Sequence, residues 1–174
     1  MARAPSRVLV AVGIGVVLLA GACGGSASTS AEPIAHGSAR HGVGPAAREV
    51  CEDMVRDSLP YSVGLPPVAD PAQTVRGDTF WCLYTFDGGS LDLSVRDLHT
   101  VREAREHFRL LRGRESVGDA LSGLAEGGFT KSDGSVVAMK DAMILTVDVT
   151  RLPPTENDRA NVGIDVASTV LGCW

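Results

Sequence analysis

The sequence predicts one α+β domain in two layers, an antiparallel sheet packed by helices, with the element order α-β-β-α-β-β-β-α. Three observations predict this class. Several segments alternate apolar and polar residues and follow one another at hairpin distance, which is typical of antiparallel strands. The segments 46–58 and 100–112 carry apolar residues at helical spacing. The chain has 174 residues, 44% of them hydrophobic, which suits a single domain with appendages.

Residues 1–22 have the layout of a lipoprotein-type signal peptide. Two arginines are followed by residues 8–20, which carry no charge and are too few for a membrane span of roughly 20 apolar residues. Cys23 follows Leu-Ala-Gly-Ala, as in the lipobox of bacterial lipoproteins, although Leu19 stands one place earlier than usual. We predict that Cys23 carries fatty acyl chains such as palmitate. The alternative is an ordinary secretory signal cleaved near Ala22.

Residues 23–45 are expected to be the lipidated cysteine and a disordered tether, and residues 46–174 the single domain. The tether consists mainly of small and polar residues without apolar periodicity, so it cannot bury enough surface to order itself. Removal of the signal peptide changes the net charge from −5 to −7. This acidity argues against nucleic-acid binding, and against contact between the domain's own surface and anionic lipid.

The first half of the domain is expected to contain a helix, a long connection and a hairpin. Pro45 suits a first helical turn, and four prolines mark the connection over 59–79, which has room for a short strand at its end. The aromatic segment 80–86 and the alternating segment 91–95 flank a glycine-rich turn. The helix over 46–58 has an apolar stripe of Ala47, Val50, Cys51, Met54 and Ser58.

The second helix is predicted over 100–112, because Thr100 and Glu103 have the spacing of a capping box and an apolar stripe follows them. The other face of this helix is charged and is interpreted first as a solvated surface. The alternative is a docking surface for an acidic partner, because this face holds the densest group of arginines in an acidic chain. These charges are Arg102, Glu103, Arg105, Glu106, Arg109 and Arg112.

Three strands and a helix are predicted after a loop that reaches residue 127. Asp133-Gly134 is a tight-turn signal between strands at 128–132 and 135–140. The next strand, over 143–149, alternates most clearly. The last helix, over 156–171, starts after a second capping signal, Thr155 with Asp158.

Short motifs along the chain support a resemblance. They are the lipobox at Cys23, the Ala-rich tether, the helix with Cys51, the strand Trp81-Cys82-Leu83-Tyr84, the strand Asp133-Gly134-Ser135-Val136-Val137 and the end Leu171-Gly172-Cys173-Trp174. This layout resembles uncharacterised lipoproteins of actinobacteria. Their fold is similar to PsbP/Mog-type α+β domains and to extracellular sensor domains of mycobacterial kinases. The resemblance implies a surface location and no established activity, so it assigns no catalytic residue.

Three cysteines remain besides Cys23, and outside the cytoplasm cysteines tend to pair. Cys51 and Cys82 form the favoured disulfide, since a helix packed on a strand brings two such positions within reach. The pair Cys51–Cys173 is the next alternative, and Cys82–Cys173 the third. A metal site is not expected, because no Cys-x-x-Cys motif and no cluster of cysteine with histidine has zinc spacing.

No catalytic residue, cofactor or metal is predicted, because no hydrolase, phosphate-loop, metalloprotease or EF-hand motif occurs. Both histidines of the domain, His99 and His107, are interpreted as surface or edge residues. Paired carboxylates would need to converge in a cleft to act as acid and base. Asp92, Asp97 and Asp148 lie on or beside strands, and Asp92 and Asp148 are expected to face solvent.

The sequence therefore favours a non-catalytic binding or interaction module. We expect it on the extracytoplasmic face of the cell membrane, anchored by lipid at Cys23, with an unknown envelope protein as partner. One alternative is a carrier or sensor of an apolar small ligand held between sheet and helices. Another, which the sequence favours least, is an envelope hydrolase.

Overall fold

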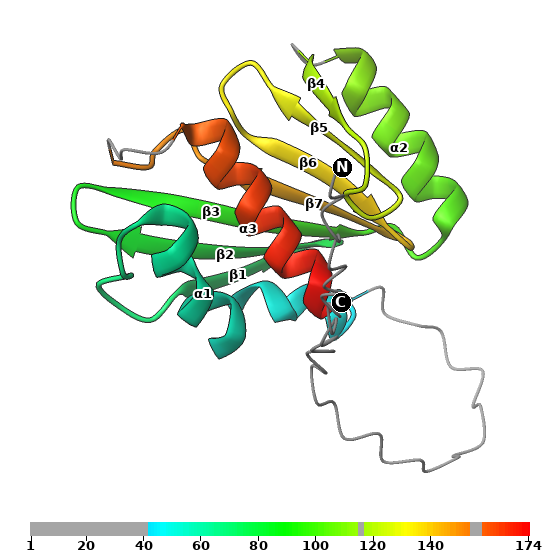
Figure 1. Cartoon of the computed structure of the whole chain (residues 1–174). Coiled ribbons are helices and arrows are strands. Elements are labelled where there is room, and N and C mark those ends of the chain that lie inside the picture. Colours follow the sequence, from blue (N-terminus) through cyan, green and yellow to red (C-terminus); the bar gives the residue numbers. More distant parts are fainter. Residues whose placement is uncertain (1–41, 115–116, 154–157) are drawn as a thin grey trace, which may run out of the picture. The chain divides into compact units, whose positions relative to one another are not determined.

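A computed structural model describes residues 42–114, 117–153 and 158–174, all within one compact unit (Figure 1). The predicted signal peptide, Cys23, most of the tether and Thr155 lie outside the described residues. None of the helices in the described ranges has the length and apolarity needed to span a bilayer. The elements are a 3₁₀ helix η1 (Ala46–Cys51), α1 (Asp53–Val63), β1 (Ala72–Arg76), β2 (Thr79–Phe86), β3 (Gly89–Asp97), α2 (Val101–Arg114), β4 (Val117–Leu121), β5 (Gly127–Lys131), β6 (Val136–Lys140), β7 (Met143–Asp148) and α3 (Arg159–Cys173).

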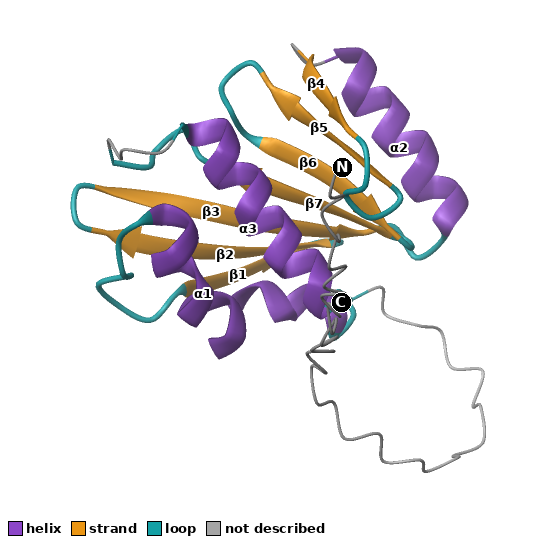
Figure 2. Cartoon of the chain, viewed as in Figure 1, coloured by secondary structure: helices purple, strands orange, loops and turns teal. Residues whose placement is uncertain are grey.

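The α+β class with an antiparallel sheet is confirmed. The seven strands form one sheet in the order β1-β2-β3-β7-β6-β5-β4, and every neighbouring pair is antiparallel (Figure 2). The strands before α2 and those after it form two meanders, which meet where β3 pairs with β7. That central pairing brings residues 46 to 56 positions apart in the chain into register.

The main core lies on one face of the sheet, beneath η1, α1 and α3. Alternation in β2 points Phe80, Cys82 and Tyr84 into this core. The Tyr84 hydroxyl donates a hydrogen bond of 2.7 Å to the carbonyl oxygen of Val50 in η1. Burial raises the pKa of Tyr84, so the phenol keeps the proton that this hydrogen bond uses.

The other face of the sheet carries α2, which adds a partial third layer to the two layers expected. The apolar side of α2 packs over β5, β6 and β7 in a second core. Its Phe108 ring lies against Phe129, with the ring centroids 5.4 Å apart. The reason is visible in β6, where four consecutive residues from Val136 to Met139 are buried. Such a run, unlike an alternating one, indicates a strand that is covered on both faces.

The first helix differs from its prediction. It is divided at Glu52, whose backbone is extended, into η1 and α1, and α1 continues to Val63. The break changes the helical phase, so Met54 is 50% exposed instead of extending the stripe of Val50 and Cys51. The strand β4 was not predicted, whereas β1, a strand of five residues, lies where the sequence left room for a short strand.

Packing also begins earlier than the predicted domain boundary at residue 46. Val43 is buried in the main core, and the Gly44 amide donates a hydrogen bond of 3.1 Å to Asp97 Oδ2. Both residues had been assigned to the tether. A single valine between glycines has no periodicity, so the sequence carries no signal for this docking.

Candidate functional site

One part of the sheet surface is left uncovered by the described helices. On its face of the sheet α2 packs over β5, β6 and the beginning of β7, so the same face of β1, β2, β3 and the end of β7 stays accessible. We call this surface the open face. Strand register places the following residues on it: Ala72, Thr74, Arg76, Thr79, Trp81, Leu83, Asp92, Ser94, Arg96, Thr146 and Asp148.

Trp81 stands near the middle of the open face. It alternates with the buried Phe80 and Cys82, so the strand that anchors the core presents the indole to the other side. Trp81 and Leu83 are half-buried, although β2 is flanked on both sides by strands. The neighbouring strand β1 is exposed along its whole length. Large apolar side chains are therefore held on a rigid strand at an accessible surface.

A hollow of about 280 Å³ lies on the open face and is open to solvent. Its lining mixes the apolar side chains of β2 with polar and charged groups from β1 and β3. The lining residues are Ala72, Thr74, Arg76, Trp81, Leu83 and Asp92.

The register orders the charges of the open face along the strands. At one end Asp92 of β3 lies directly opposite Asp148 of β7. At the other end Arg76 and Arg96 flank Thr79 on the adjacent strands. Trp81 lies between the two ends. The open face thus has carboxylates at one end, an aromatic side chain in the middle and guanidinium groups at the other end. Protein interfaces commonly have such an arrangement, with an apolar centre and a polar rim.

The carboxylate end is electrostatically unfavourable. Burial raises the pKa of Asp92, the guanidinium of Arg151 opposes this shift, and the carboxylate of Asp148 adds to it. The Arg151 Nη2 atom lies 3.4 Å from Asp92 Oδ2. Asp148 Oδ1 accepts hydrogen bonds from the amide and the hydroxyl of Thr150. Like charges directly opposite each other destabilise a sheet, so this pair lowers the stability of the folded chain.

Replacing Asp92 by Asn should therefore stabilise the protein at neutral pH, by roughly 0.2–1 kcal/mol. Because the folded chain raises the pKa of Asp92, the folded state binds this proton more tightly than the unfolded state. The free-energy cost of ionised Asp92 in the folded state is absent below the pKa that Asp92 has in the unfolded chain. It develops as the pH rises through the higher pKa that Asp92 has in the folded chain. Urea denaturation at pH 7 and pH 3 tests this. The Asp92→Asn variant should gain stability at pH 7 and lose that gain at pH 3, and an equal gain at both would refute it.

The guanidinium end joins the open face to α2. Arg96 Nε lies 2.9 Å from Asp78 Oδ2, and Arg96 Nη1 lies 3.2 Å from His107 Nε2 in α2. Burial opposes the charge of Asp78, but hydrogen bonds from Arg96 and Thr79 hold its pKa below the usual value. Burial and Arg96 lower the pKa of His107, which favours the neutral ring that can accept the bond from Arg96. His107 is thus a half-buried residue at the border of α2 and the open face.

The cysteines of the domain lie on the opposite side of the sheet from the open face. Cys51 and Cys82 form a disulfide with their Cα atoms 5.5 Å apart, which is the pairing favoured from the sequence. It ties η1 to β2 next to Trp81. Cys173 takes no part in this bridge, and its Sγ lies 3.0 Å from Met54 Sδ.

The acidic residues singled out from the sequence have different places. Asp92 and Asp148 come together on the open face, whereas Asp97 accepts hydrogen bonds from Gly44 and His99 at the end of β3. His99 has a left-handed backbone, with φ 62°. In the ranges that the structure describes, no three His, Cys, Asp or Glu residues are grouped as metal ligands.

Comparison with known proteins gives no relative: no family model, curated protein or solved structure matches the chain. The resemblance to actinobacterial lipoproteins therefore remains an expectation. Trp81, Leu83 and Arg76 were not predicted as site residues. The sequence indicated an aromatic strand over 80–86, and no pattern in it showed that one side of this strand lacks a helix.

Proposed function

We propose that the protein is a non-catalytic binding module of the cell envelope, which meets its partner on the open face and is held by lipid at Cys23 on the extracytoplasmic side of the cell membrane. One observation carries the proposal: Trp81 and Leu83 stay accessible on a sheet surface that α2 leaves uncovered. Aromatic residues in the middle of an interface commonly contribute most of its binding energy.

The surroundings of Trp81 suit recognition of a protein partner. The strand below it is fixed by the disulfide and by the hydrogen bond of Tyr84, so little conformational entropy is lost when a partner binds. Arg76 and Asp92 supply charges of both signs at the rim of the hollow. A carrier of apolar ligands would instead bury its ligand in an enclosed, mainly apolar pocket. The open and charged hollow favours the interaction module over that alternative.

Truncating Trp81 should weaken capture of the partner. The Trp81→Ala chain, expressed in its native envelope and chemically crosslinked, should recover at least 10-fold less of the partner captured by wild type, consistent with loss of a hot-spot side chain. Tyr61→Ala is the matched control, because Tyr61 is an aromatic residue of α1 on the other side of the sheet and is 89% exposed. Equal recovery by wild type and the Trp81→Ala chain, or an equal loss in both variants, would contradict the proposal.

The anchor has a separate test. Metabolic labelling with an alkyne fatty acid should mark the wild-type chain, because a cysteine thiolate can accept the lipid as a thioether. The Cys23→Ala variant should carry no label. A labelled Cys23→Ala chain would show that the anchor is wrong, whatever the open face binds.

A further inference from the structure

The helix α2 is positively charged in an otherwise acidic protein. It contains five arginines and two glutamates, a net charge of +3, whereas the whole chain has −5. None of the five arginines has a place in the second core, which α2 makes through Ala104, Phe108 and Leu111. The charge of this helix is therefore available at the surface.

Four of these arginines form one stripe along α2. Arg102, Arg105, Arg109 and Arg112 are spaced by three, four and three residues, which keeps them on one side of an α-helix. All four are exposed. Glu103 projects from another side of the helix, whereas Glu106, four residues after Arg102 and three before Arg109, lies beside the four arginines. We call these four residues the arginine stripe.

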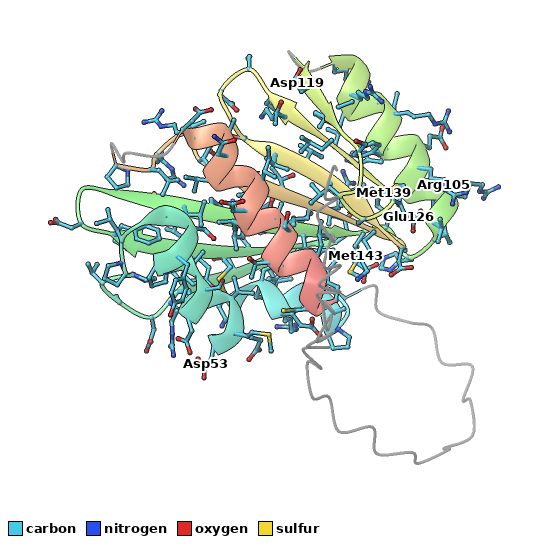
Figure 3. All side chains as sticks on the ribbon, viewed as in Figure 1. Asp53, Arg105, Asp119, Glu126, Met139 and Met143 are labelled. Carbon is cyan, nitrogen blue, oxygen red and sulfur yellow. A yellow bond between two sulfur atoms is a disulfide. The ribbon has the colours of Figure 1, made fainter. Side chains whose placement is uncertain are left out.

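The contacts of the stripe leave most of its charge available. Arg105 Nη2 lies 3.5 Å from Glu126 Oε2, and Arg109 Nε donates to the carbonyl oxygen of Arg105. In Figure 3 the Arg105 side chain extends from α2 away from the sheet. Among the described residues, the Arg105–Glu126 contact is the one ion pair of the stripe, and it is solvent-exposed. Exposed pairs of this kind neutralise little charge and are weak.

The chain enters the domain beside the first turn of α2. Asp97 connects the entering chain to the start of α2. Its Oδ2 accepts a hydrogen bond of 3.1 Å from the Gly44 amide, and its Oδ1 accepts one of 3.0 Å from the His99 amide. The next residue, Thr100, accepts from the Glu103 amide and begins α2. Only 18 residues, 24–41, separate Cys23 from the described domain. A random-coil segment of 18 residues spans roughly 25 Å on average.

We propose that the arginine stripe docks the domain on anionic lipid headgroups of the membrane in which the chain is anchored. This inference rests on the lipid anchor of the proposed function. Guanidinium groups bind phosphate through paired hydrogen bonds, and a tether of this length holds the stripe at a high local concentration near the headgroups. The arrival of the tether at α2 favours the membrane over an acidic protein segment as the occupant.

The net charge of −7 after signal removal had argued against such contact. Charges farther away than the Debye length, about 8–10 Å in physiological salt, contribute little to binding at a surface. The local charge of the stripe therefore decides whether the domain approaches a membrane. Each arginine near an anionic surface strengthens binding about five-fold.

Co-sedimentation with vesicles tests the docking. The mature chain, residues 23–174, is used with Cys23→Ala so that no acyl chain contributes. It should bind vesicles containing phosphatidylglycerol and not vesicles of phosphatidylcholine alone, and 0.5 M salt should release it. The double variant Arg102→Gln/Arg109→Gln should bind about 25-fold more weakly. Glu106→Gln, which removes a negative charge beside the arginine stripe, should bind at least as tightly as the parent chain.

Arg76→Gln and Arg151→Gln, combined, are the matched control, because they remove the same charge from exposed positions outside α2. An equal loss in this control would show that only net charge matters and would overturn the docking. Binding to poly-glutamate without binding to phosphatidylglycerol vesicles would also overturn it and would indicate an acidic protein segment. Circular dichroism and a thermal melt verify that each variant is folded. The assay contains neither the partner nor a lipid anchor, so its failure is distinguishable from failure of the Trp81 and Cys23 experiments.

Discussion

Removing the Cys51–Cys82 disulfide should lower the free energy of unfolding by roughly 3.5 kcal/mol. The bridge closes a 31-residue segment, and opening it restores the conformational entropy of the unfolded chain. Cys82 is fully buried and Cys51 nearly so, and replacing them by Ala leaves space in a packed core. For a domain of this size the melting temperature should fall by 10 °C or more. Urea denaturation of the Cys51→Ala/Cys82→Ala variant measures the change.

Cys173→Ala is the control for this experiment. Cys173 is outside the bridge and only half-buried, so its replacement should cost less than about 1 kcal/mol. If reducing agent destabilises the wild type and the Cys173→Ala variant equally, and leaves the double variant unchanged, the bridge is the one described. A double variant as stable as the wild type would contradict this pairing.

Replacing Phe129 by Ala should cost about 3–5 kcal/mol, the usual range for a buried phenylalanine. Phe129 is fully buried and its ring lies against that of Phe108, so its loss also loosens α2 from the sheet. Urea denaturation measures the free energy of unfolding. Hydrogen exchange should show lower protection of α2 amides than of α3 amides, because α3 packs on the other face.

The exposed Leu110 provides the comparison within α2. It is 48% exposed, so Leu110→Ala should change the stability by less than about 0.5 kcal/mol. Similar losses for Phe129→Ala and Leu110→Ala would mean that α2 is not packed on the second face. The open face would then extend over β5 and β6 as well, and the position of α2 would not explain why Trp81 is accessible.

Local patterns in the sequence predicted the elements whose signals are short-range. Gly134 has φ 87° in the turn after Asp133, as the Asp-Gly pair predicts. At the start of α2 the Thr100 hydroxyl accepts from the Glu103 amide, as the capping box predicts. The reciprocal bond does not form, because Glu103 Oε2 accepts from the Thr100 hydroxyl and the Thr100 amide donates to the Leu98 carbonyl. The aromatic segment 80–86 and the alternating segment 91–95 around a glycine-rich turn predicted the hairpin of β2 and β3 correctly.

Long-range packing explains what the sequence did not predict. The strand β4 contains Gly118 and has a register shift against β5, so its alternation is weak. The side of the sheet that α2 takes depends on tertiary packing and not on its own stripe. Asp92 and Asp148 meet only because β3 pairs with β7. The open face is likewise a consequence of helix placement, which a sequence pattern of one strand does not encode.

Site-specific photocrosslinking in the native envelope tests the open face most directly. A photoreactive residue at Leu83, on the open face, is compared with one at Tyr61, on α1 at the other side of the sheet. We expect a crosslinked partner from position 83, its loss when Trp81→Ala is added, and none from position 61. A partner that crosslinks from position 61 but not from position 83 would contradict the assignment of the open face as the binding surface.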